Sequence, residues 1–309
     1  MRNLSIGLIG CGIWGHKILE ELILLCSEVH VFDPVIKVDN SLLLHEQVTY
    51  HADFHQLIER PLDGVIIASA TASHHELLGM LKPYELPIFM EKPLTNSSAK
   101  LKVIQHLDLQ DVYVMHIWRY HPGVQLLAQL AQSGKLGVIK GVKSVRANWT
   151  SPRKDTDSLW NLAIHDLSIC ESILGAIPEK KQVVCQRHNG IIRGLTALMG
   201  SEPYYHFEVS NRYPHKVREI SVFGTKAVAI LRDEQVNYVA VYHGDDQSEL
   251  TSESSERIYF DDTPPLRIEL NAFLNYLEGG PAPFTDLEEG VRLTNHIIEI
   301  ESACRIECE

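Results

Sequence analysis

Three short segments combine residue types and spacings that suit chemistry, and the first is G-L-I-G-C-G-I-W-G near the start of the chain. Gly10, Gly12 and Gly15 stand in the order Gly-x-Gly-x-x-Gly, and Asp33 ends a later apolar run. Glycines at this spacing allow a tight turn and the close approach of a pyrophosphate, whose charge a following helix N-terminus stabilises. We therefore expect a dinucleotide site. The alternative is that the glycines serve only the turn.

Asp33 also bears on which dinucleotide binds. A carboxylate at the end of the second strand accepts hydrogen bonds from an adenosine ribose diol, whereas it repels a 2'-phosphate. No Arg follows at residues 34–38. We therefore expect NAD rather than NADP.

The second segment is Glu91-Lys92-Pro93, which ends another apolar run. Ligands of open α/β sheets collect beyond the carboxyl ends of the strands, so a lysine there could face both a cofactor and a substrate hydroxyl. The alternative is an ordinary solvated lysine. Residues 69–74 end the preceding strand and could hold ribose and phosphate, or only cap a helix. The expected cofactor-binding residues are Gly10, Gly12, Ile13, Trp14, Gly15, Asp33, Ser69, Thr71, His74, Glu91 and Lys92.

The third segment is S-L-W-N-L-A-I-H-D-L-S, residues 158–168. At helical spacing, Asn161 and His165 share one face. A histidine on an apolar helix more often packs in a core, but an imidazole with an ordinary pKa of ~6.5 also suits proton transfer. We expect His165 to be catalytic together with Lys92 and Asn161. Tyr120 and Trp160 are candidates for substrate contact, with core packing as the alternative.

The composition narrows the choice of partners. The chain has 309 residues and a formal net charge of −12, so it lacks the basic surface that nucleic acid or anionic lipid requires. No apolar run approaches the ~18 residues of a membrane span. The N-terminal residues lack the cleavage site of a signal peptide, so we expect a cytoplasmic location.

Cysteine and histidine spacings give no metal motif. The six cysteines are scattered, which fits reduced thiols better than a disulfide framework. Cys304 and Cys308 are close in sequence, but a metal or redox role for them is not favoured. The 16 histidines include no H-E-x-x-H. We expect no metal.

The pattern of apolar runs indicates two domains. Up to residue 120, short apolar runs alternate with helical patterns, as in βαβ units of a Rossmann-type doubly wound parallel sheet. Residues 121–309 read as an α/β domain with a large, open, mainly antiparallel sheet, whose consecutive strands suggest a meander. We expect residues 1–120 to bind the dinucleotide and residues 121–309 to bind substrate and to mediate oligomerisation. The expected strands are 4–9, 29–32, 64–69, 86–90, 112–116, 141–149, 181–188, 191–199, 204–211, 218–223, 227–231 and 236–242, and the helices 13–25, 54–59, 73–81, 97–107, 122–133, 158–174, 266–277 and 287–304.

Four segments in order resemble the Gfo/Idh/MocA oxidoreductase family: G-C-G-I-W-G-H, V-I-I-A-S-A-T-A-S-H, E-K-P-L and W-N-L-A-I-H-D-L-S. The resemblance covers essentially the whole chain. It implies oxidation of a sugar or cyclitol hydroxyl, or reduction of the matching ketone, with NAD(P). It also implies that Lys92 and His165 are the active-site lysine and histidine, and that the chain forms a homodimer or homotetramer through its second sheet.

Asn161 departs from the family, which usually has Asp four residues before the histidine. The Trp14 motif and the helix motif are similar to the subgroup that acts on nucleotide-linked or polysaccharide-precursor sugars, although Asn161 and Ile164 replace an Asp and a Pro there. Two other functions stay open. One is an NAD-binding regulatory or redox-sensing protein with little turnover, and the other is a reductase of a non-sugar substrate such as a bilin or an imine.

Overall fold

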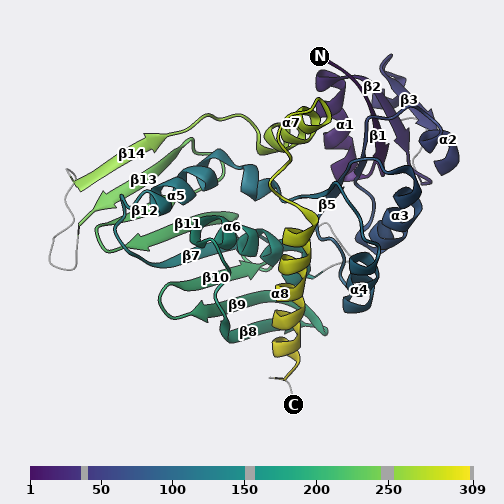
Figure 1. The fold of residues 1–309 in the computed structure, drawn as a ribbon. Helices are drawn as coiled ribbons and strands as arrows, with labels where there is room; N and C mark the ends of the chain where they lie inside the picture. Colours follow the sequence, from purple (N-terminus) through teal and green to yellow (C-terminus); the bar gives the residue numbers. More distant parts are fainter. Residues whose placement is uncertain (36–40, 150–156, 245–253, 307–309) are drawn as a thin grey trace. The chain divides into compact units, whose positions relative to one another are not determined.

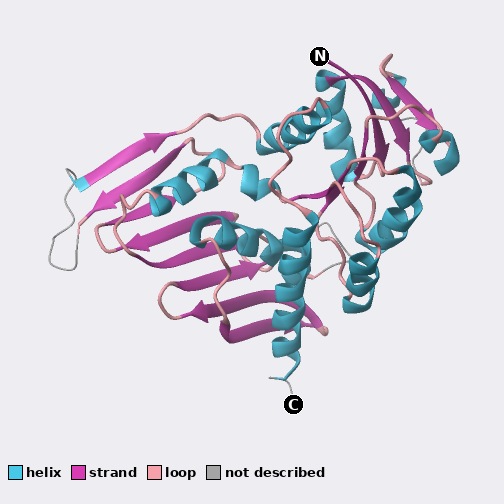
Figure 2. Ribbon diagram, in the orientation of Figure 1, coloured by secondary structure: helices cyan, strands magenta, loops and turns pink. Residues whose placement is uncertain are grey.

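The computed structural model describes residues 1–35, 41–149, 157–244 and 254–306. The chain divides into two compact units, each with its own sheet (Figures 1 and 2). The first contains Met1–His116 and Leu266–Asn295, and the second contains Ile117–Pro265 and His296–Glu309. No helix in the described ranges is long and apolar enough to cross a membrane.

The first unit is built on a six-stranded sheet in the order β3-β2-β1-β4-β5-β6, in which neighbouring strands are parallel. The strand order reverses between β1 and β4, which is where open α/β sheets bind ligands beyond the strand ends. The short strand β3 was not predicted. The strands are β1 (Arg2–Ile9), β2 (Cys26–Phe32), β3 (Val48–His51), β4 (Gly64–Ile67), β5 (Ile88–Glu91) and β6 (Val112–Met115).

Helices pack on this sheet, and one of them comes from late in the sequence. In α7, Phe273 stacks on Phe89 of β5, with ring centroids 5.1 Å apart. By its contacts, α7 therefore belongs to the first unit, although it lies late in the sequence. The functions expected of the two domains, dinucleotide binding by residues 1–120 and substrate binding by residues 121–309, stay predictions. The helices are α1 (Ile13–Leu25), α2 (Phe54–Ile58), α3 (His74–Leu81), α4 (Ser98–His106), α7 (Pro265–Leu277) and the first part of α8 (Leu287–Ile306).

The second unit contains an eight-stranded sheet in the order β14-β13-β12-β11-β7-β10-β9-β8. Its mainly antiparallel character was predicted correctly, but a simple meander is wrong. Strand β7 inserts between β10 and β11 and pairs parallel with β10, a long-range pairing that strand spacing does not reveal. Strand β14 was not predicted. The strands are β7 (Ile139–Ala147), β8 (Lys180–His188), β9 (Ile191–Gly200), β10 (Tyr204–Ser210), β11 (Val217–Gly224), β12 (Ala227–Leu231), β13 (Tyr238–His243) and β14 (Ser255–Tyr259).

Helices α5 (Pro122–Gln132) and α6 (Ile164–Leu174) lie on one face of this sheet (Figure 1). The single helix predicted for residues 158–174 is divided, because Leu159–Ala163 form a π-helical turn before α6 begins. Gly175 ends α6 with a φ of 80°, in the left-handed region that favours glycine.

One cysteine pair corrects the expectation of reduced thiols. Cys185 in β8 and Cys304 in α8 form a disulfide across 119 residues of sequence. The last turns of α8 reach β8, where the Arg187 guanidinium also donates a hydrogen bond to the Cys304 carbonyl over 3.5 Å. Such a pairing depends on tertiary placement that cysteine spacing cannot show. Cys308 lies outside the described residues.

His30 and His51 form a buried pair in the first unit. Nδ1 of His30 lies 2.9 Å from Nε2 of His51, and Nε2 of His30 lies 3.1 Å from the Glu28 carboxylate. His30 therefore donates to Glu28 and accepts from His51, which fits two neutral rings. Burial lowers the pKa of both imidazoles.

This pair should make the protein less stable in mild acid. Because the folded-state pKa values lie below the unfolded value of about 6.5, the unfolded chain takes up more protons as the pH falls below about 6.5. We expect the free energy of unfolding, measured by urea denaturation, to decrease from about pH 7 to about pH 5. The decrease should be less steep in His51→Gln. Equal slopes for the two proteins would show that the pair does not contribute.

Candidate active site

The glycine loop between β1 and α1 has the form that a pyrophosphate needs. Gly10 has a φ of 95°, and a Cβ there would lie 2.6 Å from the Ser69 amide nitrogen. A Cβ on Gly15 would lie 2.1 Å from the Gly10 carbonyl oxygen, so both glycines are required by packing. A Cβ on Gly12, in contrast, would meet nothing within 4 Å. Gly12 is also the N-cap of α1, and as a glycine it supplies no capping side chain to the first amides of the helix. We call this open space at Gly12 the cradle.

Replacing Gly12 by Ala should weaken the binding of NADH without destabilising the fold. The new methyl group fits the protein alone but occupies the space through which a phosphate would approach. We expect NADH affinity, measured by fluorescence titration, to fall at least about tenfold with little change in melting temperature. Gly79→Ala in α3 is the matched control, because a Cβ there also meets nothing within 4 Å. Unchanged NADH affinity in Gly12→Ala would contradict the cradle.

Asp33, predicted only as a ribose ligand, also holds this loop. Its Oδ2 accepts a hydrogen bond from the Cys11 amide over 2.7 Å, and its Oδ1 accepts one from the Val35 amide over 2.8 Å. Each carboxylate oxygen retains further acceptor capacity for a ribose hydroxyl. Burial and the charge of Asp33 raise the pKa of the Cys11 thiol to about 11, so the thiol stays protonated.

The other residues predicted to bind the cofactor differ in exposure. Ile13 is 79% exposed at the start of α1, and Trp14 is half-buried with the Lys17 ammonium 5.0 Å from its ring centroid. Glu91 and Lys92 are half-buried at the carboxyl end of β5. Thr71 is buried.

His74 is completely buried and connects two loops. Its Nδ1 lies 3.0 Å from the Pro93 carbonyl oxygen, and its Nε2 lies 3.2 Å from the Ser69 carbonyl oxygen. The imidazole thereby ties the segment after β4 to the segment that follows Lys92. This placement indicates a supporting role beneath the expected site, and a direct contact between His74 and cofactor stays a prediction.

In the second unit, His165 lies in the first turn of α6 and is 9% exposed. Asn161 is half-buried in the preceding π-helical turn, a feature often found at functional sites. Trp160 and Tyr120 are 5% and 1% exposed, which favours packing over substrate contact.

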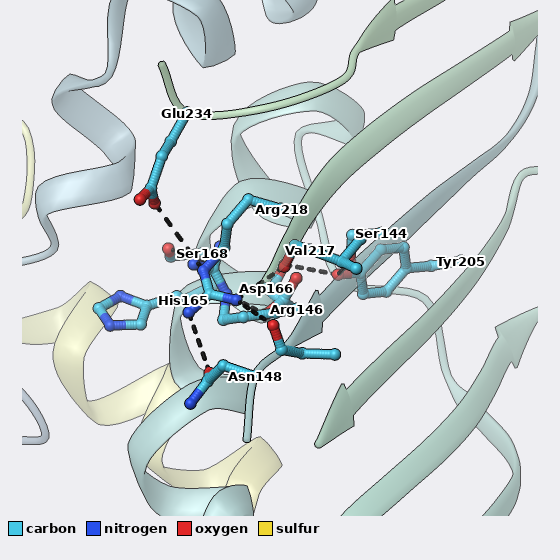
Figure 3. Close-up of polar contacts among 11 residues, drawn as sticks. Ser144, Arg146, Asn148, His165, Asp166, Ser168, Tyr205, Val217, Arg218 and Glu234 are labelled. Carbon is cyan, nitrogen blue, oxygen red and sulfur yellow. Dashed lines mark hydrogen bonds and ion pairs between the residues drawn. The ribbon is translucent and has the colours of Figure 1, made fainter. Parts of the chain in front are cut away.

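Sequence reasoning missed a polar cluster beside His165 (Figure 3). Arg146 of β7 donates a hydrogen bond from Nε to Oδ2 of Asp166 over 2.6 Å, and both side chains are buried. The sequence signals were Asp166, next to His165 in an apolar helix, and an arginine within a strand-like run. Within the described part of the chain, no three His, Cys, Asp or Glu side chains form a group that could hold a metal ion.

Comparison with known proteins supports this reading of the fold. No family model matches the chain. Inositol 2-dehydrogenase 2 of Saccharopolyspora erythraea is 27% identical over 204 residues, which cover 62% of this chain and 60% of that protein. Inositol 2-dehydrogenase of Corynebacterium glutamicum is 25% identical over 222 residues, which cover 65% of this chain and 64% of that protein. The chain thus spans 60% and 64% of the length of these two relatives.

Solved structures are similar over nearly the whole chain. UDP-N-acetylglucosamine 3-dehydrogenase from Acidithiobacillus ferrooxidans has a TM-score of 0.82 at 21% identity, covering 98% of each chain. The chain has the Gfo/Idh/MocA-type fold. Levoglucosan dehydrogenase in complex with NADH, which also has this fold, gives a TM-score of 0.85 at 16% identity and covers 99% of this chain and 98% of its own. The Gfo/Idh/MocA resemblance and the fold class predicted from the sequence are therefore confirmed.

Proposed function

We propose that this chain is an NAD-dependent oxidoreductase that transfers a hydride between nicotinamide and a secondary hydroxyl, or the matching ketone, of a sugar, nucleotide sugar or cyclitol. The observation that carries the proposal is the open cradle at Gly12 beside Asp33. The names of similar proteins support it, since they include inositol, UDP-sugar and levoglucosan dehydrogenases, the last with NADH.

Lys92 and His165 have different roles in the proposed reaction. The nicotinamide, when bound, supplies the hydride acceptor or donor. Lys92, as an ammonium, donates a hydrogen bond to the substrate oxygen and stabilises the alkoxide charge that develops as hydride leaves. His165 accepts the hydroxyl proton, directly or through water. The Asn161 amide can orient the substrate or a water molecule but cannot take up a proton.

Turnover is tested by incubating the purified protein with NAD and a panel of inositols, aldoses and nucleotide sugars while following the absorbance of reduced nicotinamide. We expect one compound class to give substrate-dependent reduction of NAD. No absorbance change for any compound, despite measurable NADH binding, would instead favour a regulatory or redox-sensing NAD-binding protein. That second function is favoured by Asn161, where an acid was expected. Reduction of a bilin or an imine, the third possibility, is tested separately by adding NADH with such a compound and following the loss of absorbance of the reduced nicotinamide.

Replacing Asn161 by Asp tests what the amide contributes. A carboxylate in the turn before His165 should stabilise its imidazolium, so the acid limb of the kcat profile should move to higher pH. We expect kcat at about pH 7 to change by less than about tenfold, measured by steady-state kinetics. Complete loss of activity with unchanged NADH affinity would instead show that the amide makes a specific contact with the substrate.

The subgroup that acts on nucleotide-linked or polysaccharide-precursor sugars is our preferred substrate class, on the basis of the Trp14 and Trp160 motifs. A homodimer or homotetramer formed through the second sheet and a cytoplasmic location are further parts of the proposal. Light scattering and cell fractionation test them directly.

A further inference from the structure

We propose that Arg146 and Asp166 are positioning residues that hold His165, through a buried ion pair beneath the first turn of α6, in the orientation and protonation state that proton transfer needs. This inference rests on the proposed function, in which His165 is the base. Its geometry lies entirely within the second unit (Figure 3).

The ion pair is deeply buried, and one of its partners is the residue that follows His165 in the chain. The Arg146 and Asp166 side chains are 4% and 1% exposed, and Asp166 follows His165 in the helix. The second carboxylate oxygen, Oδ1, is also buried and has no hydrogen-bond partner among the described residues. Buried ion pairs are often replaced by apolar side chains without loss of stability, so stability alone is a weak reason for this one.

Two further hydrogen bonds fix the backbone at the same point. The Tyr205 hydroxyl donates to the Asp166 carbonyl oxygen over 2.8 Å, and the Ser168 hydroxyl donates to the His165 carbonyl oxygen over 2.7 Å. The Ser144 hydroxyl lies 2.7 Å from the Tyr205 hydroxyl. Side chains of β7 and β10 thus anchor the helix at the residue after His165, immediately beyond the π-helical turn.

A second guanidinium group, that of Arg218, lies on the same face of the sheet as Arg146. Arg218 of β11 is the register partner of Arg146, so both side chains project from the same sheet face. Arg218 donates to the Ala147 carbonyl over 2.9 Å and to the Asn148 side chain over 3.1 Å, and its Nε lies 3.8 Å from Glu234. Asp166 is therefore the buried carboxylate partner of Arg146, while Arg218 has Glu234 as its own counter-charge.

Arg146 is also held by stacking. Its guanidinium lies 4.1 Å from the centroid of Trp118, which stacks in turn on His121 at 5.0 Å. The pKa of His121 is lowered, mainly by burial. Other titratable or charged groups on α6 and on the segments packed around it include Arg119, Tyr120, Lys140, Lys143, Asp157, Cys170, Glu171 and Tyr205.

Removing the positive charge of Arg146 and removing the negative charge of Asp166 should shift the pKa of His165 in opposite directions. In Arg146→Met, the carboxylate of Asp166 is no longer neutralised and favours the imidazolium, so its pKa should rise. In Asp166→Asn, Arg146 loses its counter-charge and its guanidinium disfavours the imidazolium, so the pKa of His165 should fall. Tyr205→Phe removes a backbone anchor without changing a charge, so it should lower kcat without shifting the pKa.

The test is an NMR titration of the imidazole of His165 in the full chain, assigned with His165→Asn, in the wild type and the three variants. Opposite shifts in Arg146→Met and Asp166→Asn, with a smaller shift in the double variant, would support the proposal. Shifts of the same sign, or none, in folded variants would overturn it. If Asp166→Asn does not fold, Arg146→Lys is the substitute test. This variant retains the positive charge, so the pKa of His165 should stay near the wild-type value. A shift as large as that of Arg146→Met would overturn the proposal.

This titration does not require turnover. If the pKa shifts are opposite but no compound of the panel reduces NAD, the proposed function fails and the electrostatic coupling stands. If the wild type turns over, Arg146→Met should lower kcat at least about tenfold with little change in KM for the substrate. An unchanged kcat in that variant would contradict a positioning role in the reaction.

Discussion

Lys92→Ala should lower kcat by about 100- to 1,000-fold while NADH affinity changes little, because the ammonium is proposed to stabilise charge that develops on the substrate oxygen only during hydride transfer. Lys92 lies at the carboxyl end of β5, where parallel sheets present ligand contacts. Steady-state kinetics with the best substrate of the panel and fluorescence titration with NADH measure the two quantities.

Lys102→Ala is the matched control, because Lys102 is an exposed lysine of α4 in the same unit. It should retain wild-type kcat and wild-type NADH affinity. Lys92→Arg keeps the charge but changes the donor geometry, so we expect partial activity. A wild-type rate in Lys92→Ala would remove this residue from the mechanism.

His165→Asn should lower kcat by about 100- to 10,000-fold, the usual contribution of a general base. The base must be unprotonated to accept the hydroxyl proton, so sugar oxidation by the wild type should slow as the pH falls below the pKa of the imidazole. The variant has no such group, and its residual rate should vary little between about pH 5 and about pH 8. A rate–pH profile in the oxidative direction shows both effects.

His188→Asn, at an exposed histidine of β8, controls for the loss of an imidazole elsewhere in the same unit. It should leave both the rate and the pH profile unchanged. If His165→Asn retained the acid limb of the wild-type profile, another group would have to be the base.

Local sequence patterns were sufficient for most elements of the fold. The predicted helix over residues 13–25 agrees with α1 at both ends, because the apolar spacing of Ile18 and Leu22 and the glycines before it act locally. Strand β7 shows what local patterns do not predict, namely the position of a strand within its sheet. Its residues read correctly as a strand, but its insertion between β10 and β11 depends on pairing with segments far along the chain.

The candidate site, too, could be predicted only in part from local sequence patterns. The glycine loop, Asp33, Lys92 and His165 were chosen from motifs, and their assignment as site residues stays a prediction. The contact between Asp33 and the Cys11 amide, the bridge made by His74 and the ion pair beneath His165 join residues that are separated in sequence. No local pattern specifies such contacts, because they form only when strands and loops come together in the folded chain.

The most direct measurement of the central claim uses members of the substrate panel that carry deuterium on their carbinol carbons. The protein is incubated with NAD and each compound, and the reduced nicotinamide is analysed by mass spectrometry. We predict that deuterium from one compound class appears in NADH, and that Lys92→Ala and His165→Asn greatly slow its appearance. NADH binding with no transfer of deuterium from any compound would contradict the proposal that this chain is a sugar or cyclitol dehydrogenase.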